Sequence, residues 1–454
     1  MNWKQEFLAS LDGTIGFEKD AFIEAHQAPP PVSIRLNPSK AIDPTDVFAA
    51  TGIQGKVPWC SEGYYLQCRP VFTLEPLLHA GAFYVQEASS MFLHHALETV
   101  LKGRNGLHAV DLCAAPGGKT TLLASLPYFD VILANEIIQS RVGVLSENLV
   151  KWGSNHVLVS NNDPEEVAQL GEQFDLVLVD APCSGSGLFR KDEAAMNEWS
   201  TDAVALCAGR QKRILHHAMS LVKEGGFLLY STCSFSTIEN EANADVIIDS
   251  GLFQSSRLSV PPEWGIVETL SEKHQAYGYR FYPHKVAGEG FFTALFQKTS
   301  GSVNEEKEFA AKLIPEAKIG LSWLSAEQQP ISFHMKGNDL FFLQEKTLQC
   351  LREWASVLRI RKSGVKMGTV IRGELIPDHE LALSPLLKKD ISVIDLNKEE
   401  AIRYLRRDDV DGRDFKNGWY IVRTEGLPLG WAKMVNGRLK NHYPLSWRIL
   451  MSPI

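Results

Sequence analysis

The chain has 454 residues, 44% of them hydrophobic and 22% charged, which is typical of a globular protein of about three domains. Its net charge of -8 would by itself discourage a nucleic-acid partner, but residues 351–454 carry +6 and residues 1–350 carry -14. No apolar run approaches the ~18 residues of a membrane span, the chain start lacks a secretory-signal pattern, and the seven scattered cysteines include no Cys-x-x-Cys pair. These features predict a cytoplasmic protein without membrane contact, disulfide framework or metal site.

The N-terminal region, which we place at residues 1–75, begins with a helical pattern. Its first apolar residues, in WKQEFLASL, have helical spacing. The prolines of PPPVSIRLNPSK then restrict the backbone to extended shapes. We expect a small region of mixed helix and strand ahead of the main domain.

Residues 76–299 alternate β-type apolar runs with helical stretches. The β-type runs lie at 107–113, 131–136, 156–160, 174–180, 226–233, 279–284 and 291–298, and helical patterns cover 120–126, 140–153 and 204–226. Such alternation predicts a parallel sheet with helices on both faces. In an open sheet of this kind, ligands bind at the carboxyl ends of the strands.

A glycine-rich turn follows the first of these strands in AVDLCAAPGGKTTLLA (109–124). Backbone N–H groups at such a turn suit an anionic or carboxylate-bearing ligand. The turn lacks the G-x-G-x-x-G of dinucleotide sites. It also departs from a phosphate-binding P-loop, because Cys113 stands where the first glycine should be. An ATPase is therefore disfavoured.

Acidic residues follow the next two strands. Glu136 ends LANE, where a carboxylate would accept hydrogen bonds from a ribose diol, and Asp163 ends SNND, at a position suited to an adenine amino group. Each acid alone is more often a turn residue. A loop for an amino-acid end, an acid for ribose and an acid for adenine, in this order, predict S-adenosylmethionine as the cofactor.

Two further strands end in thiols and an acid. FDLVLVDAPCSGSG places Asp180 and Cys183 at one strand end, and GGFLLYSTCSFS places Cys233 at another. A free cysteine is commonly a small buried hydrophobic residue. Two thiols at the ligand-binding edge of the same sheet instead indicate reactive groups.

The end of the chain has the composition of a separate module. KTSGSVNEEKE (298–308) reads as a polar linker, residues 300–365 form a linking domain, and residues 366–454 form a basic domain rich in strands and turns. Lys433, Arg438, Lys440 and Arg448 could contact phosphates, and Trp419, Trp431, Tyr443 and Trp447 could stack on bases or fill the core.

The motifs DLCAAPGGKT, DAPCSGSGLFRKD, YSTCSFSTIENE and GFFTALF resemble those of the RNA (cytosine-5) methyltransferases of the Nop2/NSUN/RsmB type. FYVQEASSM and GLPLGWAKMVNGRLKNHYP further resemble the RsmF-type 16S rRNA methyltransferases, which carry a C-terminal PUA-like RNA-binding module. The resemblance implies a Rossmann-like α/β methyltransferase core, an N-terminal α+β extension at residues 1–75 that binds RNA, and a small β-rich PUA-like RNA-binding domain.

The resemblance also assigns roles. Cys233 matches the family nucleophile, Cys183 the Pro-Cys motif thiol, and Asp180 the acid beside the target base. The cofactor residues would be Cys113, Ala114, Ala115, Pro116, Gly117, Gly118, Lys119, Glu136, Asp163 and Asp180. The residues alone leave the two thiol roles open, because a Pro-Cys thiol attacks the base in cytosine-5 DNA methyltransferases.

Arg35, Asn37, Tyr84 and Gln86 could contact either RNA or the catalytic loop, and the sequence does not decide between these alternatives. The resemblance implies C5-methylation of cytosine in 16S rRNA through a Cys233–C6 adduct. It implies 16S rRNA or the 30S subunit as partner, and we expect a monomer. A tRNA cytosine-5 methyltransferase and a non-catalytic RNA-binding assembly factor are the alternatives. The intact Cys233, Cys183 and Asp180 argue against the second, since a binding module has no use for pocket thiols.

Overall fold

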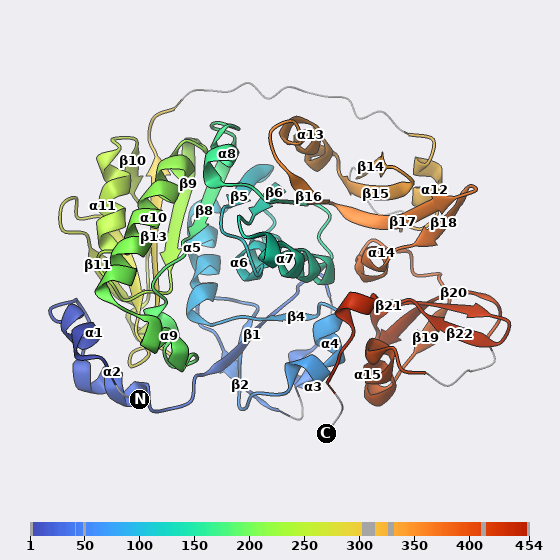
Figure 1. Cartoon of the computed structure of the whole chain (residues 1–454), viewed down its shortest axis with the longest axis horizontal. Helices are drawn as coiled ribbons and strands as arrows, with labels where there is room; N and C mark the ends of the chain where they lie inside the picture. The colour runs from blue at the N-terminus through green and yellow to red at the C-terminus, as the bar shows by residue number, and fades with distance from the viewer. Residues whose placement is uncertain are drawn as a thin grey trace.

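The computed structural model describes residues 3–40, 42–48, 51–301, 314–325, 331–409 and 415–451, so most of the predicted linker at 298–308 lies outside the described residues. A large central sheet is flanked by a small N-terminal sheet and two four-stranded sheets from the last third of the chain (Figure 1). Among the described residues, no helix is long and apolar enough to cross a membrane.

The central sheet has the strand order β11-β12-β13-β9-β8-β5-β6-β7-β16, and β10 pairs with β13. Its strands are β5 Leu107–Asp111, β6 Phe129–Asn135, β7 Val157–Ser160, β8 Phe174–Asp180, β9 Val222–Thr232, β10 Phe253–Ser255, β11 Val267–Leu270, β12 Tyr277–Phe281, β13 Phe291–Lys298 and β16 Ile360–Ser363. Strands β5 to β9 run parallel, as the alternating pattern predicts.

Two details of the predicted sheet are wrong. The strands after β9 are antiparallel, because the short connection from β12 to β13 has no room for a crossover helix. The helical pattern predicted to reach residue 226 ends at Met219, and β9 begins at Val222. Gly225 has a φ of 73°, a left-handed conformation that cannot continue a helix.

Alternate strand residues face two apolar cores, one on each side of the sheet. Ala109 packs into a core with Leu122 and Leu145, whereas its neighbour Val110 packs into another with Ile214 and Trp354. The helices that surround the sheet are α5 Phe92–Leu101, α6 Gly118–Leu123, α7 Gln139–Trp152, α8 Pro164–Ala168, α9 Glu193–Glu198, α10 Thr201–Met219, α11 Glu241–Asp249 and α13 Glu345–Trp354. This arrangement leaves the carboxyl ends of β5 to β9 at one edge.

The N-terminal region contributes two helices and a four-stranded antiparallel sheet of order β2-β3-β1-β4. Its elements are α1 Gln5–Ser10, α2 Lys19–Ala25, β1 Val32–Leu36, α3 Pro44–Val47, β2 Ile53–Lys56, β3 Gly63–Leu66, α4 Pro76–His79 and β4 Phe83–Val85. Phe7 and Phe22 pack with Phe189 and Trp199 of the central domain. The first two helices are thereby fixed to the domain that carries the thiols.

The last third of the chain forms the sheets β14-β15-β17-β18 and β19-β20-β21-β22. Its elements are α12 Ala317–Leu321, β14 Ile331–Lys336, β15 Asp339–Gln344, β17 Val365–Ile371, β18 Glu374–Pro377, α14 His379–Leu383, β19 Val393–Asp395, α15 Lys398–Arg406, β20 Gly418–Thr424, β21 Leu427–Val435 and β22 Arg438–Asn441. Short 3-10 turns lie at Phe72–Leu74, Ser89–Met91, Ser186–Leu188, Pro262–Trp264 and Leu445–Trp447.

The tail and the N-terminal sheet lie side by side (Figure 1) and share one apolar core. Ile34 and Phe83 of the sheet cluster with Val422 and Tyr443 of the tail. A salt bridge of 2.5 Å joins Lys398 Nζ to Glu75 Oε2 across the same boundary. The tail is therefore packed against the rest of the molecule and does not project from it.

Candidate active site

The predicted cofactor loop turns over the carboxyl ends of β5 and β6. Its main chain is held from outside: the side chains of Arg141 and Asn148, on α7, donate to the carbonyl oxygens of Ala115 (2.6 Å) and Pro116 (2.8 Å). Gly117 adopts a φ of 111°, and a Cβ there would lie 3.3 Å from Leu145 Cδ1. The backbone conformation thus requires glycine at this turn, and the close packing leaves little room for a side chain.

Arg35, on β1, supports this loop and the helix that follows it, and Gln86 holds the Arg35 side chain in place. The buried Arg35 guanidinium donates to Thr121 Oγ1 (2.6 Å) and to the Gly118 carbonyl oxygen (3.2 Å), while its Nε donates to Gln86 Oε1 (2.8 Å). Burial lowers the pKa of Arg35 to about 10. The side chain of Arg35 thus contacts the cofactor loop and its helix, whereas that of Gln86 contacts Arg35 and Ser90.

Asp111, at the end of β5, is completely buried beneath the loop. Its Oδ2 accepts a 2.7 Å hydrogen bond from Thr120 Oγ1, and its Oδ1 has no hydrogen-bond partner among the described residues. Burial raises the pKa of Asp111 to about 7, and the nearby Asp180 carboxylate adds to that rise. Burial also raises the pKa of Cys113, so this thiol stays protonated and packs against the core.

Glu136 lies directly after β6 and is 2% exposed. Its two oxygens accept from the backbone N–H groups of Ala115 (3.3 Å) and Ile138 (2.8 Å), and Arg141 lies 3.5 Å away. The carboxylate therefore connects the loop after β5 to the turn after β6. Each of its oxygens has a second lone pair for a ligand hydroxyl.

Asp163 caps α8 and pairs with Arg213, a residue that no sequence motif singles out. Its carboxylate accepts from the Glu165 N–H at 3.0 Å and pairs bidentately with Arg213, at 2.8 and 3.1 Å. Burial opposes ionisation here, but these hydrogen bonds outweigh it and lower the pKa of Asp163. The acid is ionised at the strand end where the sequence places it.

Asp180, at the end of β8, connects the cofactor loop to the thiols. Its Oδ2 accepts from Lys119 Nζ at 2.6 Å, and its Oδ1 accepts from Ser231 Oγ of β9 at 2.8 Å. Burial would lower the pKa of Lys119, but the charge of Asp180 and the hydrogen bond to it, with smaller effects from Asp111 and Cys233, raise it. Lys119 is therefore a charged ammonium paired with the acid.

The two predicted thiols meet. Strands β8 and β9 are parallel neighbours, and the loops after them place Cys183 Sγ and Cys233 Sγ 3.0 Å apart. The hydrogen bond to Cys233, burial and the negative charges of Cys233 and Glu239 raise the pKa of Cys183 well above its usual value. Cys183 is thus held as a thiol that can donate to its neighbour.

Glu239, a buried acid from the TIENE segment, fixes both cysteine loops. Its carboxylate accepts from the Ser184 N–H (2.8 Å), from Ser184 Oγ (2.5 Å), from Ser234 Oγ (2.5 Å) and from Gln211 Nε2 (3.1 Å). The hydroxyls belong to the residues that follow Cys183 and Cys233. Glu239 lies in the motif YSTCSFSTIENE, but its role cannot be read from that motif, because its hydrogen bonds form only in the folded chain.

A cavity of about 160 Å³ opens beside the cofactor loop and Asp180. The cofactor loop and Asp180 form one side, and Tyr84, Gln86, Glu87 and Ser90 of the N-terminal region form the other. Its lining therefore joins the N-terminal segment to the predicted cofactor and base-binding residues. Among the described residues, no three His, Cys, Asp or Glu side chains are grouped so that they could hold a metal ion.

Comparison with known proteins now gives the family. A model described as 16S rRNA methyltransferase RsmB/F matches residues 98–297. The N-terminal domain of 16S rRNA methyltransferase RsmF matches residues 4–88, and the methyltransferase RsmF PUA domain matches residues 391–449. Ribosomal RNA small subunit methyltransferase F of Shewanella oneidensis is 30% identical over 94% of this chain and 92% of its own length. The Vibrio parahaemolyticus protein of that name is 30% identical over 93% and 92%.

The chain belongs to the RsmF-type 16S rRNA methyltransferases of the RsmB/F family.

Solved structures agree with this family at the level of the fold. A methyltransferase homologue from Pyrococcus horikoshii is 28% identical, with a TM-score of 0.52 over 65% of this chain and 99% of its own. NSun6 from the same organism, solved with the S-adenosylmethionine analogue SFG, has a TM-score of 0.54 at 21% identity over 66% of this chain and 99% of its own. The predicted fold class, a Rossmann-like methyltransferase core with a C-terminal PUA domain, is confirmed.

The cofactor of this RsmF-type methyltransferase is S-adenosylmethionine, as predicted. The residues present fit it: the cavity borders the loop, and the buried Asp111 Oδ1 has no hydrogen-bond partner in the part of the chain that the structure describes. Besides Glu239, reasoning from the sequence missed Arg213, Arg359 and Arg361. All three arginines contact the strand-end turns from elsewhere in the chain.

Proposed function

We propose that this methyltransferase methylates C5 of cytosine in 16S rRNA, with Cys233 as the nucleophile that adds to C6. The observation that carries the assignment is a difference between two touching thiols, whose Sγ atoms lie 3.0 Å apart. The hydrogen bond to Cys233, burial and the negative charge of Glu239 raise the pKa of Cys183, so Cys183 is the thiol that keeps its proton. Cys183 can then donate to Cys233, which leaves Cys233 as the sulfur that adds to C6.

The chemistry requires this difference. Cytosine C5 is a weak nucleophile until a thiolate adds to C6, which places the ring electrons on C5. When bound, S-adenosylmethionine supplies an electrophilic methyl group for the activated C5. Loss of the C5 proton then returns electrons to the ring and expels Cys233 as a thiolate.

Asp180 and Cys183 support the steps on either side of methyl transfer. The Asp180 carboxylate can accept from the edge of the cytosine and stabilise the ring when N3 becomes protonated. Its pairing with Lys119 and Ser231 keeps it oriented at the strand end. Cys183, held protonated 3.0 Å from Cys233, can assist removal of the C5 proton or release of the product.

The remaining predicted residues would hold the cofactor. The loop Cys113–Lys119 would bind its amino-acid end, Glu136 its ribose and Asp163 its adenine. Glu136 and Asp163 come from the turns after β6 and β7, which are parallel neighbours. Their order along the sheet supports an adenosine that lies across the two strand ends.

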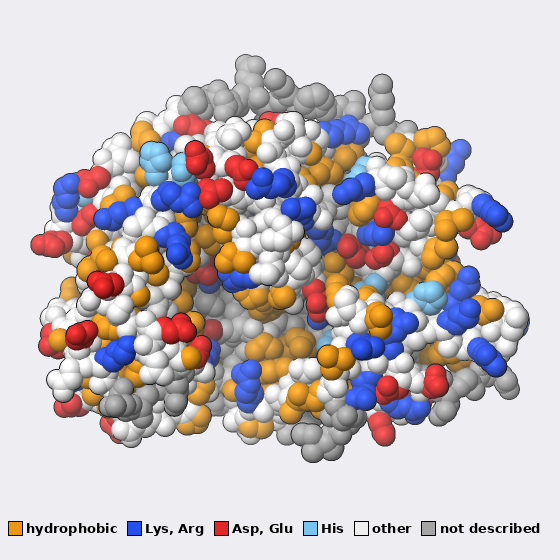
Figure 2. All heavy atoms as spheres, in the orientation of Figure 1, with side chains coloured by type: hydrophobic (Ala, Val, Ile, Leu, Met, Phe, Trp, Pro, Cys, Tyr) orange, Lys and Arg blue, Asp and Glu red, His pale blue; other side chains and the backbone are white. Residues whose placement is uncertain are grey.

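The RNA would approach the face that is hollowed at its centre in Figure 2, below α6 and α7. A second cavity, of about 210 Å³, lies between the N-terminal sheet and α7 and is lined by Phe83, Tyr84, Lys151 and Trp152 among others. Lys and Arg side chains also gather over the tail on this face (Figure 2). These features support a partner that contacts the N-terminal sheet and the tail together, in the cytoplasm.

Bisulfite sequencing of total RNA from cells with and without this gene tests the proposal. We expect one or more 16S rRNA cytosines to lose protection when the gene is absent, and tRNA cytosines to stay unchanged. Loss of protection in tRNA would favour the tRNA alternative. Unchanged protection everywhere would contradict cytosine methylation. Purified protein assayed with labelled cofactor on free 16S rRNA and on 30S subunits then distinguishes the two forms of the substrate.

A further inference from the structure

A strand from the last third of the chain completes the edge of the methyltransferase sheet. Strand β16 pairs antiparallel with β7, in the register Ile360–Ser160, Lys362–Val159 and Ser363–Leu158. The matched methyltransferase family model ends at residue 297, before this strand. The edge of the cofactor-binding sheet is thus built by residues more than fifty positions downstream.

The helix that precedes β16 is also part of the methyltransferase core. Trp354, at the end of α13, is fully buried and packs on Phe174 with ring centroids 5.3 Å apart. Its Nε1 donates to Gln173 Oε1 at 2.7 Å. Cys350 and Leu358 belong to the same apolar core. The position of β16 is therefore fixed by packing and does not depend on its own short ladder.

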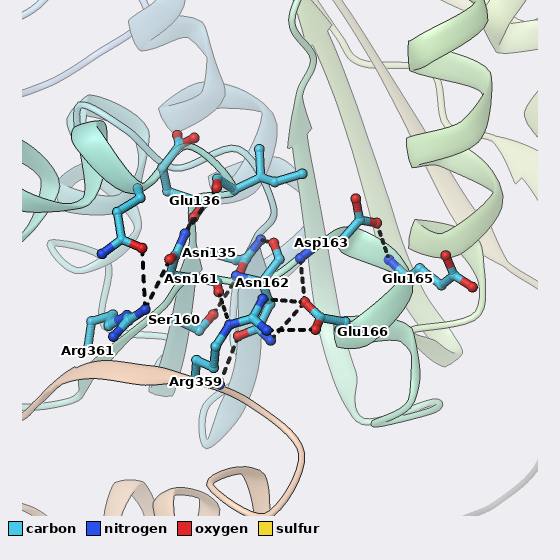
Figure 3. Close-up of polar contacts among 12 residues, drawn as sticks. Asn135, Glu136, Ser160, Asn161, Asn162, Asp163, Glu165, Glu166, Arg359 and Arg361 are labelled. Atoms are coloured by element: carbon cyan, nitrogen blue, oxygen red, sulfur yellow. Dashed lines mark hydrogen bonds and ion pairs between the residues drawn. The ribbon is translucent and has the colours of Figure 1, made fainter.

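Arg359, just before β16, forms hydrogen bonds with the turn that follows β7 (Figure 3). Its backbone N–H donates to Asn162 Oδ1 (3.0 Å), and its Nε donates to the Asn161 carbonyl oxygen (2.9 Å). The guanidinium also forms a fork on Glu166, with distances of 2.9 and 2.6 Å. Arg361 Nη2 adds a longer hydrogen bond to Asn161 Oδ1 at 3.3 Å.

The same turn is joined to the one that carries Glu136. Asn161 Nδ2 donates to the carbonyl oxygens of Glu136 (2.7 Å) and Ile137 (3.0 Å), and the Asp163 N–H donates to Glu166 Oε2 (2.8 Å). Figure 3 shows these side chains converging between β6, β7 and the strand of Arg359. The two acids of the proposed adenosine site therefore belong to one hydrogen-bonded network, and Arg359 is a solvent-exposed member of it.

The network is better suited to positioning than to stability. The Arg359 and Glu166 side chains are 55% and 35% exposed, and an exposed pair of this kind contributes little to folding. A fork with a third bond to a backbone carbonyl nevertheless fixes geometry well. We propose that Arg359, assisted by Arg361, is a positioning residue for the adenosine end of S-adenosylmethionine.

This inference rests on the proposed placement of adenosine at Glu136 and Asp163, but not on cytosine chemistry. Its test is calorimetric titration of the full-length protein with S-adenosylmethionine, without RNA. Arg359→Met should weaken binding about tenfold, as expected when charge-assisted hydrogen bonds are lost. Glu166→Gln should weaken it in the same direction, and Arg359→Lys, which keeps charge but loses the fork, should lie between.

Arg352→Met is the matched control, because Arg352 is exposed on α13, and we expect wild-type affinity from it. With saturating cofactor, Arg359→Met should keep its kcat and raise only the KM for S-adenosylmethionine. Wild-type affinity in Arg359→Met, or a lowered kcat with unchanged KM, would overturn the inference. Loss of cofactor affinity together with a melting temperature far below that of Arg352→Met would also overturn it, since that result reports a merely structural role. None of these outcomes depends on which base is methylated.

Discussion

The Sγ atoms of Cys183 and Cys233 lie 3.0 Å apart, although fifty residues separate them in the chain. The contact exists because β8 and β9 are parallel neighbours whose following loops share Glu239 as a hydrogen-bond acceptor. Two thiols this close cannot both be ionised readily. The surroundings of Cys183 raise its pKa, so Cys183 is the sulfur that keeps its proton.

We expect opposite behaviour from the two cysteine variants. Cys233→Ala should lose turnover by about 10³-fold or more, as expected for a removed nucleophile, and should form no denaturant-resistant complex with 16S rRNA. Cys183→Ala should still attack and methylate, then stall, and so accumulate a protein–RNA complex on a denaturing gel. The double variant should show no complex.

Cys68→Ala is a suitable control, because Cys68 is exposed and does not line the cavity beside Asp180. It should keep wild-type turnover. A complex trapped by Cys233→Ala and absent from Cys183→Ala would make Cys183 the nucleophile. Two unstable variants that trap nothing would instead indicate two packing residues.

Glu239→Gln should disturb both thiol loops at once. The buried carboxylate accepts four hydrogen bonds, and an amide that faces those donors leaves at least one unpaired, which costs about 1–3 kcal/mol. Because the Glu239 charge is one cause of the raised pKa of Cys183, its removal should lower that pKa. The pH dependence of Cys183 alkylation, followed by mass spectrometry, measures this change.

Glu241→Gln provides the control for stability. Glu241 is also a buried acid, but it pairs with Arg280 and does not face the thiols. We expect a lower melting temperature without a change in the alkylation profile. Equal profiles for the Glu239 and Glu241 variants would show that Glu239 does not act on the thiols.

Asp111 should make folding stability depend on pH. Its pKa is about 7 in the folded protein against 3.8 for the free side chain, so between these values the folded state binds one more proton than the unfolded state. The contribution of Asp111 to the free energy of unfolding is therefore largest below pH 4. It falls by up to roughly 4 kcal/mol as the pH rises to 7. Asp111→Asn keeps an acceptor for Thr120 and removes the ionisation.

Thermal unfolding from pH 5 to pH 8 checks this expectation. The variant should gain stability relative to wild type as the pH rises, whereas Asp12→Asn, at an exposed position, should show no such trend. If the difference in stability between the wild type and Asp111→Asn stays constant across this range, the Asp111 carboxyl is not protonated in the folded protein.

Much of this site could be predicted from the sequence, because its residues follow buried strands. An apolar run that ends in an acid or a cysteine identifies both the strand and its carboxyl end, and parallel strands bring those ends together. Asp180, Cys183 and Cys233 therefore lie on neighbouring strands as expected. The exact contact of the thiols depends on Glu239, whose hydrogen bonds have no local signature.

The remaining features depend on contacts between distant segments. Strand β16 has four residues and is only partly buried, so nothing in its sequence indicates that it extends a sheet formed two hundred residues earlier. The shared core of the N-terminal sheet and the tail is also hidden, since each apolar face resembles an ordinary small core. Trp431 and Tyr443, which could have stacked on bases, are fully buried and fill cores instead.

That shared core determines how the tail should be tested for RNA binding. Deletion of the tail would expose Ile34 and Phe83 of the N-terminal sheet. A loss of RNA binding could then come either from lost RNA contacts or from damaged folding. Point variants avoid the problem: Lys433, Arg438 and Lys440 lie on β21 and β22, next to the partly exposed Trp419, whose ring lies 4.9 Å from Lys433 Nζ.

The triple change Lys433→Gln, Arg438→Gln and Lys440→Gln should weaken binding of 16S rRNA and make it less sensitive to salt. Each phosphate contact contributes about 0.7–0.9 to the slope of log affinity against log salt, so three lost contacts should reduce the slope by about two to three. Filter binding from 50 to 300 mM potassium chloride, about the range over which such contacts are screened, would measure it. The affinity for S-adenosylmethionine should not change.

Lys102→Gln with Lys212→Gln, two exposed lysines outside the tail, should leave the slope nearly unchanged. If the tail variant kept the wild-type slope and the control lost it, RNA would bind the central domain without the tail.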